Sequence, residues 1–128
     1  METRPLVQSL LREMVASLQA KLRVRSIVLF GSVARGEERS RSDIDLIIVS
    51  DEFPKSYSSR FDLLRPIFQE AKARDSYVQL LKKGCRFTFS AVPYRPEDLT
   101  DTPPLLLDVA EDGMILYDDG LMQNTLRE

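Results

Sequence analysis

The sequence predicts one small α/β (α+β) domain, with a mixed β-sheet of about four strands flanked by helices. Segments with apolar residues every three or four positions alternate along the chain with short apolar runs, as in helices that cover a sheet. The 128 residues, 43% of them hydrophobic, are sufficient for one domain with one core. No repeat, low-complexity segment or linker divides the chain, so we expect a single domain over residues 1–128.

The N-terminal half is expected to contain one helix and two buried strands. The range 5–21 has apolar residues at helical spacing, with a proline in its first turn and Thr3 as a candidate cap. The apolar run over 25–30 ends abruptly at Gly31 and predicts the first strand. The β-branched run over 44–49 predicts the second strand.

After a loop over 50–59, the spacing of the apolar residues predicts one longer helix. This helix is expected to end near Gly84, because two lysines and the glycine suit a helix C-terminus. The run over 86–92 alternates apolar and polar residues, as a strand with one covered face does. We expect the inner face of the helix to lie in the core, and it is marked by Phe61, Leu64, Phe68, Ala71 and Val78.

Residues 103–128 are expected to form a C-terminal helix–strand extension of the same domain. A short helix is predicted over 105–111, a terminal strand over 114–117, and a helical tail from 121 onward. So small a domain offers little surface for selecting a substrate alone. We therefore expect a partner protein or a homodimer, with the extension as a candidate interface.

Composition excludes several classes of function. There is no histidine, which removes histidine-based triads, the usual zinc sites and imidazole acid–base chemistry. The net charge of −2, with 30% charged residues, is unlike a disordered or wholly basic protein. A single cysteine, an N-terminus unlike a signal peptide and no apolar run of about 20 residues lead us to expect a cytoplasmic protein without membrane contact.

Two carboxylates are the candidate catalytic and metal-binding residues. On a strand, Asp43 and Asp45 point to the same face while Ile44 points to the other, with the two carboxylates about 7 Å apart along the chain. Mg²⁺ commonly binds one or two carboxylates together with substrate phosphates and water. Such a pair can support in-line nucleotidyl transfer.

The turn before this strand suits a phosphate. Gly31 directly after a strand lets the backbone turn tightly and approach a ligand. If a helical turn opens at Ser32, its free N–H groups face an anion, and the Ser32 hydroxyl and the Arg35 guanidinium add further donors. Phosphate-binding and metal-binding groups would then lie side by side.

Gly31-Ser32, ten intervening residues and Asp43-x-Asp45 together resemble the signature of the DNA polymerase beta-like nucleotidyltransferase superfamily. The similarity is strongest over about residues 25–50, where GSVARG and SDIDL match the minimal single-domain members. The resemblance implies that fold. It also implies triphosphate binding by Gly31 and Ser32, Mg²⁺ ligation by the aspartates, and transfer of a nucleoside monophosphate, often AMP from ATP, to a hydroxyl. Many minimal members are antitoxin-like partners of a small helical HEPN-domain protein, and some adenylylate a tyrosine of it.

The sequence departs from the superfamily at the third carboxylate, which normally lies on the strand beside the Asp pair. The candidate strand over 86–92 carries Thr88 and Ser90 on its polar face, and a hydroxyl is neutral near pH 7. The other acidic candidates, Asp62, Glu97 and Asp98, do not match the motif position. The alternative to an enzyme is therefore a catalytically weak nucleotide-binding or protein-binding module, and a purely structural interaction domain is a third hypothesis.

Other interpretations of the motif fail. Apolar residues fall where an EF-hand needs oxygen ligands, and no G-K-[ST] follows at P-loop spacing. A cationic cluster between residues 21 and 41 has two interpretations. It is either an electropositive rim that attracts a triphosphate or nucleic acid, or an ordinary solvated surface. The cluster comprises Lys21, Arg23, Arg25, Arg35, Arg39 and Arg41.

Overall fold

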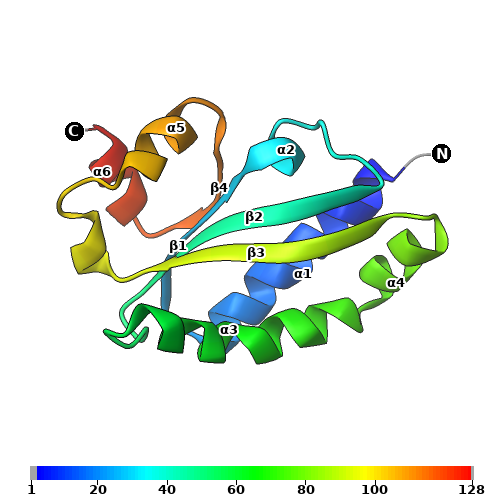
Figure 1. Cartoon of the computed structure of the whole chain (residues 1–128), viewed down its shortest axis with the longest axis horizontal. Coiled ribbons are helices and arrows are strands. Elements are labelled where there is room, and N and C mark those ends of the chain that lie inside the picture. Colours follow the sequence, from blue (N-terminus) through cyan, green and yellow to red (C-terminus); the bar gives the residue numbers. More distant parts are fainter. Residues whose placement is uncertain (1–2, 128) are drawn as a thin grey trace.

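The chain forms a four-stranded mixed sheet with helices packed against both faces (Figure 1). This computed structural model describes residues 3–127. The mixed four-stranded sheet flanked by helices confirms the expected α/β (α+β) fold class. The elements are α1 Arg4–Lys21, β1 Val24–Phe30, α2 Gly31–Ala34, β2 Arg41–Ser50, α3 Tyr57–Lys72, α4 Asp75–Lys82, β3 Arg86–Tyr94, the 3₁₀ helix η1 Pro96–Leu99, α5 Pro104–Asp112, β4 Met114–Asp118 and α6 Leu121–Arg127.

The strand order across the sheet is β3-β2-β1-β4. β1 runs antiparallel to both β2 and β4, whereas β2 and β3 are parallel. A parallel pair needs a long crossover connection, which α3 and α4 supply. β3 therefore lies at one edge of the sheet, directly beside the strand that carries the Asp pair.

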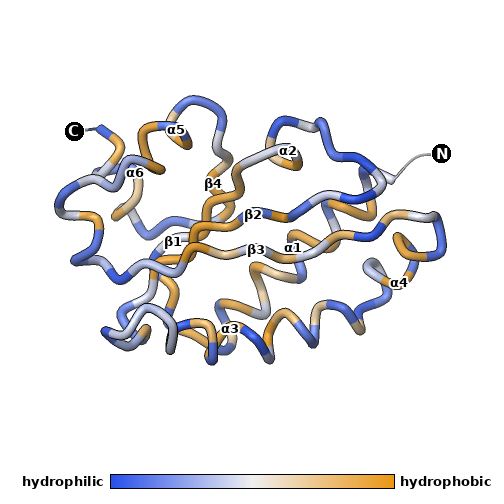
Figure 2. The backbone as a smooth tube through the Cα atoms, viewed as in Figure 1, coloured by the Kyte–Doolittle hydropathy of each residue, from blue (hydrophilic) through white to orange (hydrophobic). Residues whose placement is uncertain are grey.

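Two apolar clusters lie on opposite faces of the sheet. The larger one packs α1, α3 and α4 against the sheet, and the smaller one packs α5 and α6 against Val28, Ile47 and Val49. Successive residues over 27–29 of β1 and 46–49 of β2 alternate between these clusters, which explains why these parts of the two strands are continuous apolar runs (Figure 2). Asp43 and Asp45 share the face of Ile47 but lie outside the smaller cluster, so this end of the face stays uncovered.

The prediction of one long helix before Gly84 was wrong. The segment forms α3 and α4, which are separated at Ala73 and Arg74. Arg74 adopts an extended conformation with ψ of 152°, and its guanidinium donates to the Ser17 hydroxyl of α1 at 3.0 Å. Neither residue at the break is glycine or proline, so the sequence carries no local signal for it. Gly84 does have the expected left-handed conformation, with φ of 85°.

The inner face of α3 also differs in part from expectation. Leu64 and Ala71 are buried as predicted, but Phe61 and Phe68 are only half-buried. At the start of α1, Thr3 occupies the N-cap position without a side-chain capping hydrogen bond. Within residues 3–127, no helix has the length and apolarity that crossing a bilayer requires.

A buried arginine fastens α3 to the far end of β3. Arg60 is 5% exposed, and its guanidinium donates to the carbonyl oxygens of Pro54 at 2.8 Å and Pro93 at 2.9 Å and to Asp98 Oδ2 at 2.7 Å. Burial acts to raise the pKa of Asp98, but hydrogen bonds from the Arg95 N–H and from Arg60 outweigh it, and the pKa is lowered. The ionised carboxylate is therefore favoured by folding.

Replacing this carboxylate should destabilise the fold. Asp98→Asn leaves the Arg60 cation buried without its counter-charge and should lower the free energy of unfolding by about 1–3 kcal/mol at pH 7. The stabilisation is present above the unfolded-state pKa of Asp98 and is lost as the pH falls through its lower folded-state value. The difference between wild type and variant, measured by chemical denaturation, should therefore shrink below about pH 4.

Asp62→Asn is the matched control on α3. Asp62 pairs with Arg65 on an exposed surface, where both side chains are more than half exposed. Its loss should change stability by less than about 0.5 kcal/mol. Equal effects of the two substitutions at pH 7 would contradict the role assigned to Arg60 and Asp98.

Candidate functional site

The two aspartates lie on the uncovered end of β2 and point away from the main core. Ile44 between them is fully buried on the opposite face, as strand alternation requires. In register, Asp43 lies opposite Thr88 of β3 and Asp45 lies opposite Ser90. Asp45 is also paired with Phe30, the last residue of β1. The pair is thus bordered by β3 on one side and by the end of β1 on the other.

Each aspartate accepts a hydrogen bond from a hydroxyl of β3. Thr88 Oγ1 donates to Asp43 Oδ1, and the Ser90 hydroxyl donates to the Asp45 carboxylate. The polar face of β3 predicted from the sequence is therefore the strip of hydroxyls that orients these two side chains. A hydroxyl neutralises no charge, so the two carboxylates still repel each other.

The electrostatics of Asp45 reflect that repulsion. Partial burial raises its pKa, and the neighbouring charge of Asp43 raises it further, against the opposing effect of the Ser90 hydrogen bond. A bound cation between the carboxylates would relieve both unfavourable effects. Asp43 is exposed, whereas Asp45 is half-buried.

Gly31 lies directly against Asp45. Its φ is +80°, and a Cβ atom added there would overlap Asp45 Oδ2 and lie 3.3 Å from Asp45 Cγ. Both the conformation and the contact therefore require glycine. Ser32 follows as a half-buried residue of α2, while Val33 is fully buried in the larger core. This buried valine fixes the turn beside the carboxylates.

Arg35 does not face the carboxylates in this structure. Its guanidinium is exposed and pairs with Glu37 at 2.8 Å and with Asp112 of α5 at 3.8 Å. Both contacts are between exposed groups, which typically contribute less than about 1 kcal/mol. A phosphate can compete with them, so phosphate binding by Arg35 stays a prediction.

The donor set suits magnesium better than a structural metal. No group of three or more Asp, Glu or Cys side chains that could hold a metal occurs among the described residues. Of the other acidic candidates, Asp98 is bound to Arg60 and Asp62 pairs with Arg65 on α3. Two carboxylates on an open face, with room for phosphates and water, are what Mg²⁺ uses in nucleotide sites. The residues present therefore fit this ion.

A cavity of about 330 Å³ adjoins Asp43. It is lined by Asp43 and Thr88 together with Arg41, Ser42 and Arg86. Arg41 belongs to the cationic cluster seen in the sequence, but Arg86 was not singled out. Strands β2 and β3 begin with these two arginines in register, and such pairing cannot be read from the chain without the sheet.

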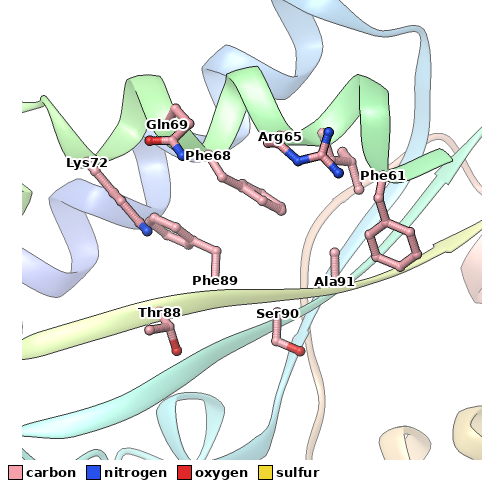
Figure 3. Close-up of a pocket in the computed structure, with 10 residues that line it drawn as sticks. Phe61, Arg65, Phe68, Gln69, Lys72, Thr88, Phe89, Ser90 and Ala91 are labelled. Carbon is pink, nitrogen blue, oxygen red and sulfur yellow. The ribbon is translucent and has the colours of Figure 1, made fainter. Parts of the chain in front are cut away.

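A larger groove of about 530 Å³ lies between α3 and the edge strand β3. Figure 3 shows Phe68 and Phe89 on the helix side of β3, with the Thr88 and Ser90 hydroxyls pointing the opposite way. The Phe68 and Phe89 rings stack at 5.3 Å. The groove contains neither Asp residue of the pair and neither Gly31 nor Ser32, although Thr88 and Ser90 of β3 are among the residues that line it.

Comparison with known proteins gives a consistent result. A family model described as a nucleotidyltransferase domain matches residues 11–116. "Putative protein adenylyltransferase MJ1379" of Methanocaldococcus jannaschii is 41% identical over 65% of this chain and 81% of its own length. A second relative from this organism with the same description, MJ1305, is 31% identical over 79% of this chain but only 64% of its own length.

Two solved structures share the fold. One is a toxin–antitoxin crystal structure with AMP-PNP, with a TM-score of 0.54 and 17% identity over 91% of this chain and 84% of that one. The other is a mutant of the toxin–antitoxin MntA-HpeT, with a TM-score of 0.55, 16% identity and the same coverage. At these identities the likeness concerns the fold alone. By the extent of the family match and the identity to its relatives, the chain belongs to the nucleotidyltransferase domain family.

Proposed function

We propose that this protein is a Mg²⁺-dependent nucleotidyltransferase that moves AMP from ATP to a hydroxyl of a protein or small-molecule acceptor. The observation that carries the proposal is that Asp43 and Asp45 share one open strand face directly against the Gly31 turn. The relatives named as protein adenylyltransferases and the AMP-PNP in a structural neighbour support adenine as the base.

Asp43 and Asp45 would hold Mg²⁺, and Gly31 and Ser32 would hold the triphosphate. When bound, the ion would neutralise phosphate charge and activate the reacting oxygens. Gly31 lets the backbone approach the ligand without a side chain, and Ser32 offers its N–H and its hydroxyl. Arg35 would leave its surface partners to add a guanidinium contact.

The proposed transfer is an in-line displacement. The acceptor oxygen bonds to the α-phosphorus, the bond from that phosphorus to the bridging oxygen of the β-phosphate breaks, and pyrophosphate leaves. The acceptor proton passes to water, since Thr88 and Ser90 are neutral hydroxyls and not bases. Their task in this scheme is to keep the two carboxylates oriented.

A protein partner is part of the proposal. The structural neighbours are toxin–antitoxin proteins, which supports an antitoxin-like role, and the resemblance to minimal nucleotidyltransferases makes a HEPN-domain protein the first candidate. Exposed apolar side chains of the C-terminal segment offer a surface for such a partner or for a homodimer, and they are Leu107, Met114 and Ile115. Nucleic acid stays open as another partner.

One observation favours a second candidate, a binding module without turnover. Hydroxyls, and not a carboxylate, stand opposite the Asp pair on β3. In that case the protein would bind Mg²⁺ and ATP, release no pyrophosphate and act by occupying its partner. Calorimetry combined with a pyrophosphate assay distinguishes the two functions.

Incubation with α-labelled ATP, Mg²⁺ and a candidate HEPN-domain partner protein should label that protein. Asp43→Asn and Asp45→Asn should each lower the transfer rate by at least about a hundredfold, because each removes an anionic ligand at the reacting phosphate. Removal of Mg²⁺ by EDTA should have the same effect. Transfer that survived the double substitution would refute the proposed roles of both aspartates.

Gly31→Ala should abolish Mg²⁺-dependent ATP binding, because the new methyl group would displace the Asp45 carboxylate. Gly36→Ala is the matched control. Gly36 also has a positive φ, +71°, but nothing lies within 4 Å of an added Cβ. Both variants carry the backbone strain of a left-handed alanine, so a binding loss confined to Gly31→Ala isolates the contact with Asp45. Equal binding by both variants, measured by calorimetry, would argue against a site at this turn.

Asp45→Asn should stabilise the metal-free protein at neutral pH. A carboxyl whose pKa is raised by folding is disfavoured in its charged form, so stability falls as the pH rises from the unfolded-state pKa through the folded-state pKa. The gain in melting temperature should be complete above the folded-state pKa and vanish below the ordinary value near 3.8.

Asp108→Asn serves as the control for that gain, because this substitution removes the same charge from an exposed position on α5. Adding Mg²⁺ and AMP-PNP should raise the melting temperature of wild type but not of Asp45→Asn. A destabilised Asp45→Asn variant at pH 7 would contradict this electrostatic account.

A further inference from the structure

Two arginines line the cavity that adjoins Asp43, and within residues 3–127 their side chains have no hydrogen-bond or ion-pair partner. Arg41 and Arg86 are the first residues of β2 and β3, and they are aligned in the parallel register. Both are exposed. Within residues 3–127, neither guanidinium makes a hydrogen bond or an ion pair.

Several other arginines of the chain pair with carboxylates, whereas the exposed Arg23 and Arg39, like Arg41 and Arg86, make no side-chain hydrogen bond or ion pair within residues 3–127. Arg4 pairs with Glu38 at 2.9 Å, Arg60 with Asp98 at 2.7 Å, and Arg25 with both Asp51 and Asp119. The sequence has 20 acidic residues against 18 basic ones, so carboxylates are plentiful. Two unpaired guanidinium groups beside each other are thus a local concentration of positive charge in a slightly acidic protein.

The space next to these arginines leads to the reacting groups. Both line the 330 Å³ cavity that contains Asp43 and Thr88, and both also line an adjoining cavity of about 210 Å³ with Leu81, Gly84 and Cys85. The arginine pair therefore borders both cavities, and the larger of the two reaches Asp43. A ligand in the 330 Å³ cavity would lie against Arg41, Arg86 and Asp43 together.

The direction of the proposed reaction assigns the 330 Å³ cavity to the acceptor. In an in-line displacement, the entering oxygen and the leaving pyrophosphate lie on opposite sides of the α-phosphorus. The proposed phosphate turn at Gly31 lies on the β1 side of Asp45, whereas Thr88 and Arg86 lie on the β3 side of Asp43. A leaving group held at Gly31 and Ser32 therefore places the attacking hydroxyl on the arginine side.

We propose that Arg41 and Arg86 form an anion subsite that selects an acceptor hydroxyl flanked by acidic residues in a protein segment. This inference rests on the proposed nucleotidyl transfer and names its substrate class. Guanidinium groups recognise carboxylates through paired N–H donors, and such contacts choose among partners by charge.

A protein segment fits this subsite better than nucleic acid. A nucleic-acid backbone is normally bound by a basic face with many phosphate contacts. Here the pair of arginines belongs to a chain with net charge −2 and a pI of about 5.3. Two guanidinium groups match the two or three carboxylates that flank a hydroxyl in a short acidic sequence.

The test measures binding of labelled peptides to the full-length protein with Mg²⁺ and AMP-PNP. The probes are Glu-Glu-Tyr-Glu-Glu, its glutamine and lysine counterparts, and a single-stranded RNA with a free 3′ hydroxyl and the same net charge as the acidic peptide. Wild type should bind the acidic peptide at least about tenfold more tightly than the glutamine peptide, and this preference should weaken as salt is added.

The variant Arg41→Glu/Arg86→Glu should reverse the preference toward the lysine peptide. The control Arg12→Glu/Arg23→Glu carries the same charge change on exposed residues that line neither cavity, and it should keep the wild-type preference. Circular dichroism and thermal unfolding check that both variants fold.

AMP-PNP affinity, measured by calorimetry on the same samples, tests the proposed function separately. The inference predicts that reversing Arg41 and Arg86 leaves this affinity unchanged. It is overturned if the arginine variant loses AMP-PNP, because the arginines then belong to the nucleotide site. Equal affinity for all three peptides, or tighter binding of the RNA than of the acidic peptide, overturns it as well.

Discussion

The site depends on one steric constraint, which is the contact between Gly31 and Asp45. Phe30 pairs with Asp45 across the sheet, so the chain that leaves β1 must pass beside that carboxylate. Only a residue without Cβ fits there, and φ of +80° turns the backbone into α2. Val33 buries the next turn in the core. The register of β1 and β2 thus brings the turn and the carboxylates together.

The uncovered face of the sheet keeps the proposed site accessible and lowers stability. Helices α5 and α6 bury Ile47 and Val49 but leave Asp43 and Asp45 open. Two neighbouring carboxylates repel each other, and burial together with this repulsion raises the pKa of Asp45. Thr88 and Ser90 compensate in part by donating hydrogen bonds. The fold therefore holds an arrangement of charge that a bound cation would stabilise, as active sites commonly do.

The sequence was sufficient to predict the four strands, the flanking helices and the grouping of Asp43 with Asp45, because these follow from local periodicity. The break between α3 and α4 was missed, since Arg74 is held by Ser17 of a distant helix and no glycine or proline marks the position. Local patterns also could not place Arg86 beside Arg41 or aim Thr88 at Asp43. Those relations depend on the parallel pairing of strands separated by two helices.

We propose that metal and phosphates meet between the Gly31 turn and the Asp pair. The most direct test is a crystal structure of the protein with Mn²⁺ and AMP-PNP, in which anomalous scattering locates the metal. We expect an anomalous peak between the carboxylates of Asp43 and Asp45, with the β- and γ-phosphates against Gly31 and Ser32. A metal bound elsewhere, or a nucleotide seated in the groove between α3 and β3, would contradict it.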